Sequence, residues 1–298
     1  MPEPIRDPLR EPLHESVRGA VPASAGVPSP PPSRPLSALR RAAPVVAGAA
    51  MCGAGFALEG SALNEALFHA VNALGPMAPR LWSALTVAGL AGVAWIIVAE
   101  ARPAEGRTPA RLLWLVVVGG LIVHLLKHAL HVARPLGQLG AGAVNIVGEA
   151  LSQGSMPSGH SATAAALATL LVIETGWATR RAAAASTGWI VLGVAICLSR
   201  IAVGAHWPGD VLVGAGLGLA FAHLACHAWP VARIARALAT PVGRRVQGVT
   251  LLLALVEPFG ATQPHHYADA RWFAWALVPL AAWGAWQRWR RDLAPAEA

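Results

Sequence analysis

Lysine is almost absent from this chain of 298 residues: Lys127 is the only one, and every other basic residue except histidine is an arginine. Charged side chains are also scarce, at 13% of the residues, whereas an ordinary soluble domain carries about 25%. Because 55% of the residues are hydrophobic, the composition excludes an ordinary soluble domain and predicts a polytopic membrane protein. A lone lysine in an apolar segment is hard to assign to solubility, so Lys127 is a candidate functional group.

Cysteine and tyrosine are rare as well. The three cysteines lie in apolar runs without a CxxC spacing, which favours free buried thiols over a metal or disulfide framework. One tyrosine stands against twelve tryptophans, many of them near the ends of apolar runs, as expected for belts at the membrane interface. The net charge of +8 could indicate nucleic acid. The arginines, however, lie in short segments between apolar runs, so we expect the lipid bilayer and no nucleic acid as a partner.

The order of polar and apolar segments predicts an all-α chain in three parts. Residues 1–41 are rich in Pro, Ser and Arg and are predicted to be a disordered cytoplasmic segment, and no signal peptide is expected because the first apolar run starts near Ala42. Residues 42–230 form the main membrane unit, and residues 231–298 form a membrane hairpin with a short cytoplasmic tail. About eight spans are predicted. The apolar runs are 42–58, 81–99, 112–131, 160–178, 186–205, 208–229, a weaker one at 249–262 that is either a short span or a re-entrant piece, and 272–287.

The arginines predict the orientation through the positive-inside rule. With the N-terminus in the cytoplasm, the cytoplasmic segments carry Arg40, Arg41, Arg102, Arg107, Arg111, Arg180, Arg181, Arg233, Arg236, Arg244, Arg245, Arg288, Arg290 and Arg291. The outer side then carries Arg80, Arg134, Arg200 and Arg271. In this topology the three polar motifs described next all lie at the outer ends of spans.

The first motif places Lys127 seven residues before Arg134-Pro135. Seven residues on a helix return to nearly the same face, so both long side chains are predicted to reach one point. Pro135 disfavours helix at Arg134, which predicts that the span ends there. For Arg134 alone, snorkelling towards lipid headgroups is an equally simple explanation. Lys127 lies about two turns inside the span, where a charge is functional by default.

The second motif is Pro157-Ser158-Gly159-His160, at the start of an apolar run. Ser158 suits a helix N-cap, and Gly159 allows a ligand to approach the backbone. Free N–H groups at a helix start bind phosphate, and His160 could protonate a leaving oxygen there. An ordinary capped helix start explains the first three residues equally well.

The third motif runs from Ser199-Arg200 to His206 and Asp210. Asp210 could accept a hydrogen bond from one nitrogen of His206 and leave the other as a nucleophile, as in a Ser-His-Asp triad. The alternative is a His–Asp pair with a purely structural role. Beside the other two motifs, the catalytic interpretation is favoured.

Together the three motifs read KxxxxxxRP, PSGH and SRxxxxxHxxxD, and they resemble the signature of the type 2 phosphatidic acid phosphatase superfamily over about residues 40–230. The resemblance implies a six-helix phosphatase core without metal or other cofactor. It implies that His206 attacks phosphorus, that Asp210 orients His206 and that His160 protonates the leaving group. The implied phosphate ligands are Lys127, Arg134, Ser158, Gly159 and Arg200.

The function implied by this resemblance is hydrolysis of a membrane lipid phosphate or diphosphate at the outer face of a bacterial inner membrane, through a phosphohistidine. Undecaprenyl diphosphate is the favoured substrate, with phosphatidate, phosphatidylglycerophosphate or lipid A as the others. The same site could instead pass phosphate to a lipid hydroxyl. A vanadium haloperoxidase shares the signature but is soluble, and an anion transporter or channel requires the motif set to be a coincidence. His223 and His227 have a spacing that could bind a metal, but a third ligand is missing.

Overall fold

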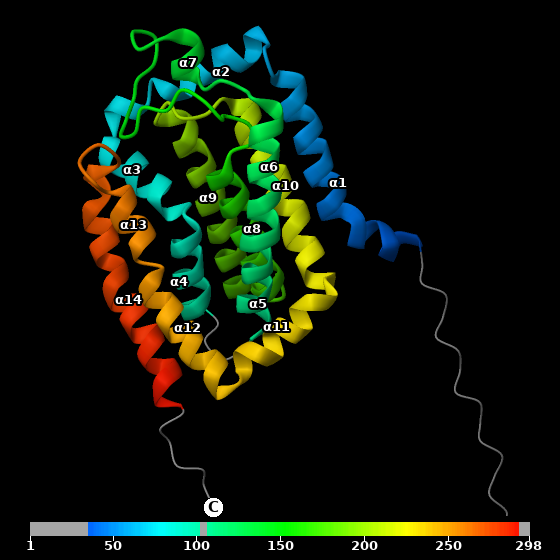
Figure 1. Cartoon of the computed structure of the whole chain (residues 1–298). Coiled ribbons are helices and arrows are strands. Elements are labelled where there is room, and N and C mark those ends of the chain that lie inside the picture. The colour runs from blue at the N-terminus through cyan, green and yellow to red at the C-terminus, as the bar shows by residue number, and fades with distance from the viewer. Residues whose placement is uncertain (1–34, 102–105, 292–298) are drawn as a thin grey trace, which may run out of the picture.

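The computed structural model describes residues 35–101 and 106–291, and in these ranges every regular element is helical (Figure 1). The prediction of an all-α chain is therefore confirmed. The α-helices are α1 Pro35–Leu58, α2 Ala62–Asn72, α3 Pro79–Ala88, α4 Ala91–Ala101, α5 Arg107–Trp114, α6 Gly120–Leu130, α7 Pro135–Leu139, α8 Gly159–Thr175, α9 Arg180–Ala202, α10 Pro208–His227, α11 Trp229–Ala239, α12 Pro241–Leu253, α13 Val256–Ala261 and α14 Arg271–Arg290. The short elements are the 3₁₀ turns η1 Gly75–Met77 and η3 Ala268–Ala270 and the π-helical turn η2 Leu115–Gly119.

Long helices with apolar outer faces support a membrane protein. Three helical segments of the described chain, Arg107–Leu139, Arg180–Ala202 and Pro208–His227, are long and apolar enough to cross a bilayer, and the number rises to five if each of two bent helix pairs counts as one span. Large apolar side chains such as Val117, Leu121 and Val191 point outwards and are more than half exposed, as expected of surfaces that face lipid. The predicted eight spans and six-helix core stay predictions.

Two of the predicted apolar runs are broken in the structure. The run at 81–99 is divided between α3 and α4, which meet at 72°. The weaker run at 249–262 is divided between α12 and α13, with a break at residues 254 and 255. Glu257 on α13 accepts a hydrogen bond from the Gly92 N–H (2.6 Å), so it satisfies a free donor at the start of α4. The first helix begins at Pro35, earlier than the apolar run near Ala42, and residues 1–34 lie outside the described chain.

The core lies where α8 packs between α4, the α5–η2 segment and α10. Its buried residues are Ala94, Val98, Leu112, Leu115, Ala166, Leu167, Leu170, Leu171, Ala222 and Ala225. On the other side of α4, the C-terminal helices α12 and α14 bury Leu251, Leu277 and Ala281. Figure 1 shows these C-terminal helices beside α4 and α3, whereas α1 runs along α10 on the opposite flank.

Helix α1 contacts α10 through glycines. A Cβ atom on Gly48 would lie 2.5 Å from the Gly216 carbonyl oxygen, and a Cβ on Gly216 would lie 2.5 Å from the Gly48 oxygen. Backbones can approach this closely only where side chains are absent, as in many membrane helix pairs. At the end of the bundle that carries the three motifs, the Asn64 side chain on α2 accepts a hydrogen bond from Gly209 N–H (3.0 Å) and holds the start of α10.

Candidate active site

The chain around Lys127 and Arg134 differs from the predicted single helix. Helix α6 ends at Leu130, and His131 caps it in the left-handed conformation (φ 51°). Arg134 follows in an extended conformation directly before Pro135 and α7. The prediction that the helix continues to Arg134 was therefore wrong, because the turn at His131 ends it one turn earlier. Arg134 reaches the site from an irregular segment instead of from the same helix face as Lys127.

Both cations nevertheless converge on one loop. Lys127 Nζ donates hydrogen bonds to the carbonyl oxygens of Gly154 (2.5 Å) and Ser155 (3.1 Å). Arg134 donates from Nη2 to the same Gly154 oxygen (3.4 Å) and from Nε to the Gln153 oxygen (2.8 Å). The predicted meeting of the two side chains is confirmed, and neutral backbone carbonyls hold them in place without cancelling their charges.

Ser158 begins α8 as the predicted N-cap. Its buried hydroxyl oxygen accepts hydrogen bonds from the Ser161 hydroxyl (2.9 Å) and the Ser161 N–H (3.4 Å), so this side chain stabilises its own helix. A Cβ atom on Gly159 would meet only Val123, at 3.8 Å, so the space beside the first residue of the helix is open to a ligand. The phosphate-binding roles of Ser158 and Gly159 stay predictions.

His206 lies between a carboxylate and a cation. Its Nδ1 atom is 3.4 Å from Asp210 Oδ2, and its Nε2 atom is 3.4 Å from Arg134 Nη1. Both members of the His–Asp pair are buried, at 2% and 0% exposure of their side chains. Nδ1 makes no hydrogen bond with the described chain, so the contact with Asp210 is close but not yet a hydrogen bond. The Nε2 atom therefore faces the cations. A nucleophile that attacks an anionic phosphate needs this position, because the cations would hold the phosphate there.

Asp210 is held by partners that the motif does not contain. Its Oδ2 atom accepts hydrogen bonds from the Ser155 hydroxyl and from the Trp207 N–H (2.8 Å). The Ser158 N–H donates to the Asp210 carbonyl oxygen (3.1 Å), which joins the second and third motifs at the starts of α8 and α10. Ser155 was not predicted, and its position in an irregular loop gives no spacing signal from which it could have been found.

The charges around His206 keep its imidazole neutral. Burial lowers the pKa of His206 well below its usual value, and the positive charges of Arg134 and Arg200 lower that pKa further. Lys127 and His160 have smaller effects on this pKa, so all three predicted cations and the second predicted histidine lie within electrostatic reach of His206. A neutral imidazole has the free lone pair that a nucleophile needs.

Arg200 is in the last turn of α9 and is only 2% exposed. Its Nη1 atom donates a hydrogen bond to the hydroxyl oxygen of Tyr267 (3.0 Å), and its buried Nε atom has no partner in the described chain. Tyr267 comes from the C-terminal segment and was not predicted from the sequence.

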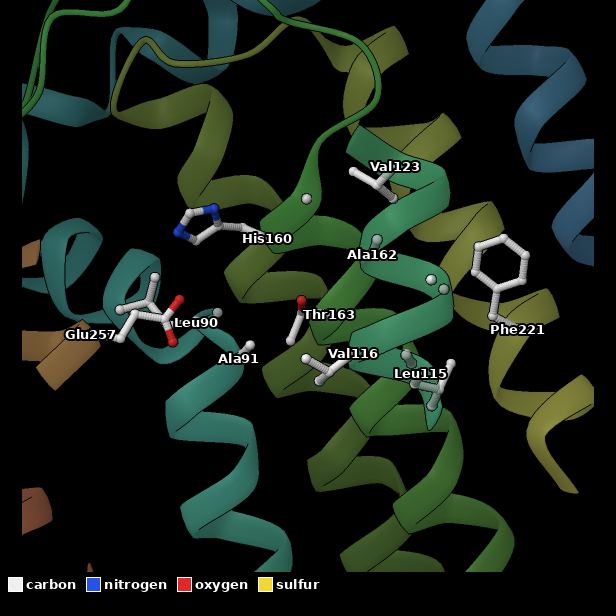
Figure 2. A pocket seen from close by; sticks show the side chains of 16 residues that line it. Leu90, Ala91, Leu115, Val116, Val123, His160, Ala162, Thr163, Phe221 and Glu257 are labelled. Carbon is white, nitrogen blue, oxygen red and sulfur yellow. The ribbon is translucent and has the colours of Figure 1, made fainter. Parts of the chain in front are cut away.

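His160 forms part of the wall of a cavity of about 260 Å³. Figure 2 shows its ring at one side of the cavity, with Thr163 and Val116 further along the wall and Phe221 opposite. Glycine, alanine and other apolar residues from α4, the η2–α6 segment, α8 and α10 make up most of the lining. This cavity is suited to a hydrocarbon chain, and it begins at the residue predicted to protonate the leaving group.

The remaining histidines pair on their own helices. The rings of His124 and His128 are 4.2 Å apart, and those of His223 and His227 are 5.0 Å apart. Within residues 35–101 and 106–291, no group of three or more His, Cys, Asp or Glu side chains is placed to hold a metal ion. The expectation of a metal-free reaction is not tested by this observation and stays a prediction.

Residues 108–234 match the family model of the PAP2 superfamily, and the match includes all three motifs. This part of the chain belongs to the PAP2 superfamily. The resemblance predicted from the motifs is thereby confirmed. The PAP2 match begins in α5 and ends in α11, so α1 to α4 and the helices from α12 onwards lie outside it.

The fold of the chain is similar to that in the crystal structure of Aquifex aeolicus LpxE. The two chains are 24% identical, with a TM-score of 0.50, and the match covers 57% of this chain and 99% of LpxE. At this identity the likeness concerns the fold. No curated protein matches this chain.

Proposed function

We propose that this PAP2 protein is a membrane lipid phosphatase that hydrolyses a lipid phosphate or diphosphate through a phosphohistidine on His206, without a metal. The observation that carries the proposal is the position of the His206 imidazole, which has the Asp210 carboxylate at Nδ1 and the Arg134 guanidinium at Nε2, each 3.4 Å away. A carboxylate on one side favours the imidazolium that forms during attack, and a cation on the other side attracts the phosphate.

In the first half of the reaction, His206 Nε2 attacks phosphorus and the bond from phosphorus to the leaving oxygen breaks. His160 gives its proton to that oxygen, and the product is a phosphohistidine. In the second half, His160 takes a proton from water, the resulting hydroxide attacks phosphorus, and the P–N bond breaks to release phosphate. The neighbouring cations disfavour a proton on His160. The two negative charges of a bound phosphate oppose this effect and favour the proton.

The phosphate oxygens are proposed to bind Lys127, Arg134 and Arg200, together with Ser158 and the Gly159 N–H at the start of α8. Lys127 and Arg134 donate hydrogen bonds to the carbonyls of residues 153–155. A phosphate dianion attracts these cations more strongly than a neutral carbonyl does, because the attraction between opposite full charges adds to the hydrogen bond. The cations therefore have neutral partners that a phosphate can displace.

The cavity at His160 supports a lipid leaving group. The group that receives the proton from His160 must lie beside that ring, and the cavity there is lined mainly by apolar residues. We propose that the chain of the departing lipid occupies it. Undecaprenyl diphosphate remains the favoured substrate, and phosphatidate, phosphatidylglycerophosphate and lipid A remain alternatives. The proposed setting is a bacterial inner membrane, with about eight spans, the N-terminus in the cytoplasm and the site at the outer face.

The test is phosphate release by the purified protein over a panel of these lipid phosphates, with and without a lipid hydroxyl as acceptor. The His206→Ala variant is expected to release no phosphate. A His223→Ala variant, which changes a histidine on α10 outside the site, is the matched control and is expected to keep full activity. Wild-type protein that releases phosphate from none of the lipids, or full activity in His206→Ala, contradicts the proposal. Transfer to the acceptor without release of phosphate supports a phosphotransferase instead.

A further inference from the structure

The C-terminal segment, which lies outside the PAP2 match, contacts Arg200 through the side chain of Tyr267. Tyr267, between α13 and η3, is 4% exposed and is the only tyrosine in the chain. Its hydroxyl oxygen accepts the hydrogen bond from Arg200 Nη1 (3.0 Å), and the guanidinium carbon is 5.7 Å from the centre of the tyrosine ring. Arg200 therefore has a hydrogen-bond partner that the family signature does not supply.

Tyr267 is itself held firmly. Its ring belongs to a buried cluster with Val87, Val203 and Ala205, and its N–H donates to the Ala261 oxygen (2.9 Å). The loop before the second motif passes directly over the ring: a Cβ atom on Gly148, where φ is +85°, would lie 2.5 Å from the ring carbon Cδ1. Only glycine fits at this position, since the conformation and the contact both exclude a side chain.

We infer that Tyr267 is a positioning residue, which fixes the Arg200 guanidinium so that its remaining donors meet the phosphate. The inference rests on the proposed phosphatase function. The buried Nε atom of Arg200 has no partner in the described chain and is one of the donors left for an oxyanion. The phenol is neutral, so it orients the guanidinium without reducing its positive charge, whereas a carboxylate would compete with the phosphate for it. The role assigned to the C-terminal segment is thus to complete the phosphate site.

The first test is Tyr267→Phe, which keeps the ring and its packing and removes only the hydroxyl. The thermal unfolding midpoint is expected to stay unchanged. Because hydrogen bonds to charged groups have large effects, kcat/KM for lipid phosphate is expected to fall about tenfold or more. Vanadate binds as a phosphate mimic, and its inhibition constant is expected to rise by a similar factor. His266→Ala changes the adjacent, partly exposed residue, whose Nδ1 atom is 3.4 Å from Glu149 Oε2, and is expected to leave both quantities unchanged.

A double-mutant cycle with Arg200→Lys separates positioning from packing. If Tyr267 acts through the guanidinium, Tyr267→Phe costs little further activity in the Arg200→Lys background. Additive effects of the two substitutions overturn the inference, and so does wild-type kcat/KM together with wild-type vanadate inhibition in Tyr267→Phe. Vanadate binding measured by calorimetry does not depend on turnover. A wild-type protein that binds vanadate but hydrolyses no lipid phosphate therefore overturns the proposed function and still allows the effect of Tyr267 on oxyanion binding to be measured.

Discussion

The cavity beside His160 makes a quantitative prediction about the length of the leaving group. An apolar cavity of about 150 Å³ can hold benzene, which has six carbons, so a cavity of about 260 Å³ holds about ten carbons. A substrate that enters from water gains about 0.8 kcal/mol for each methylene buried, which is about a fourfold gain in kcat/KM. We therefore expect kcat/KM for simple n-alkyl phosphates to rise about fourfold per carbon and to level off near ten carbons.

Gly120 is the position at which to shorten this cavity. It lies in the cavity wall, and a Cβ atom there would meet no other atom within 4 Å, so Gly120→Leu can extend into the space without striking the backbone. The four added carbons are expected to move the plateau from about ten carbons to about six, and to lower kcat/KM about 250-fold (about fourfold for each of four carbons) for the longer substrates. Substrates shorter than the remaining space are expected to react at the wild-type rate.

The assay is phosphate release from alkyl phosphates of about two to fourteen carbons, each below its critical micelle concentration so that the reference state is water. Gly188→Leu is the matched control, because Gly188 on α9 also has no atom within 4 Å of an added Cβ but does not line the cavity. A flat dependence on chain length in the wild type, or an equal loss at every length in Gly120→Leu, would refute the assignment of the cavity to the leaving group.

Three further predictions concern pH, cofactors and stability. Because burial lowers the pKa of His206, its imidazole stays neutral at pH values below the usual pKa of about 6.5. The acidic limb of the pH profile of kcat/KM is therefore expected below about pH 6.5. In Arg134→Gln, which removes a nearby cation, this limb should move to higher pH. Phosphate release is expected to survive excess chelator and to be inhibited by vanadate; activity that is lost with EDTA and restored by a divalent metal contradicts the metal-free mechanism. Gly216→Ala places a Cβ atom 2.5 Å from the Gly48 oxygen and is expected to destabilise the fold by about 1–3 kcal/mol, measured by thermal unfolding against Gly188→Ala, and an unchanged midpoint argues against the close α1–α10 contact.

Contacts between residues close in the sequence were easier to predict than contacts between distant residues. The spacing from Arg200 through His206 to Asp210 spans a helix end, a tight turn and a helix start, so local geometry alone brings these residues together. The N-cap at Ser158 follows from the same local rules. In contrast, Lys127 and Arg134 meet through a loop that follows the left-handed turn at His131, and residue spacing cannot distinguish this path from a continuous helix.

The supporting partners were missed because they depend on tertiary contacts. Ser155 reaches Asp210, and Tyr267 reaches Arg200 across 67 positions of sequence, and neither pairing has a local pattern. The breaks in two apolar runs were missed for a related reason. A hydropathy profile reports how apolar the chain is but not the direction of the helix axis. It therefore cannot detect the 72° bend between α3 and α4.

The solitary lysine also has a practical consequence. Protein grown with isotope-labelled lysine would show one side-chain ammonium resonance, from Lys127, whose Nζ now rests on the Gly154 and Ser155 oxygens. When inorganic phosphate is added, that single signal would report directly whether the ammonium leaves the loop for the anion. The protein thus carries its own spectroscopic reporter at the place where occupancy matters, with no need for an engineered label.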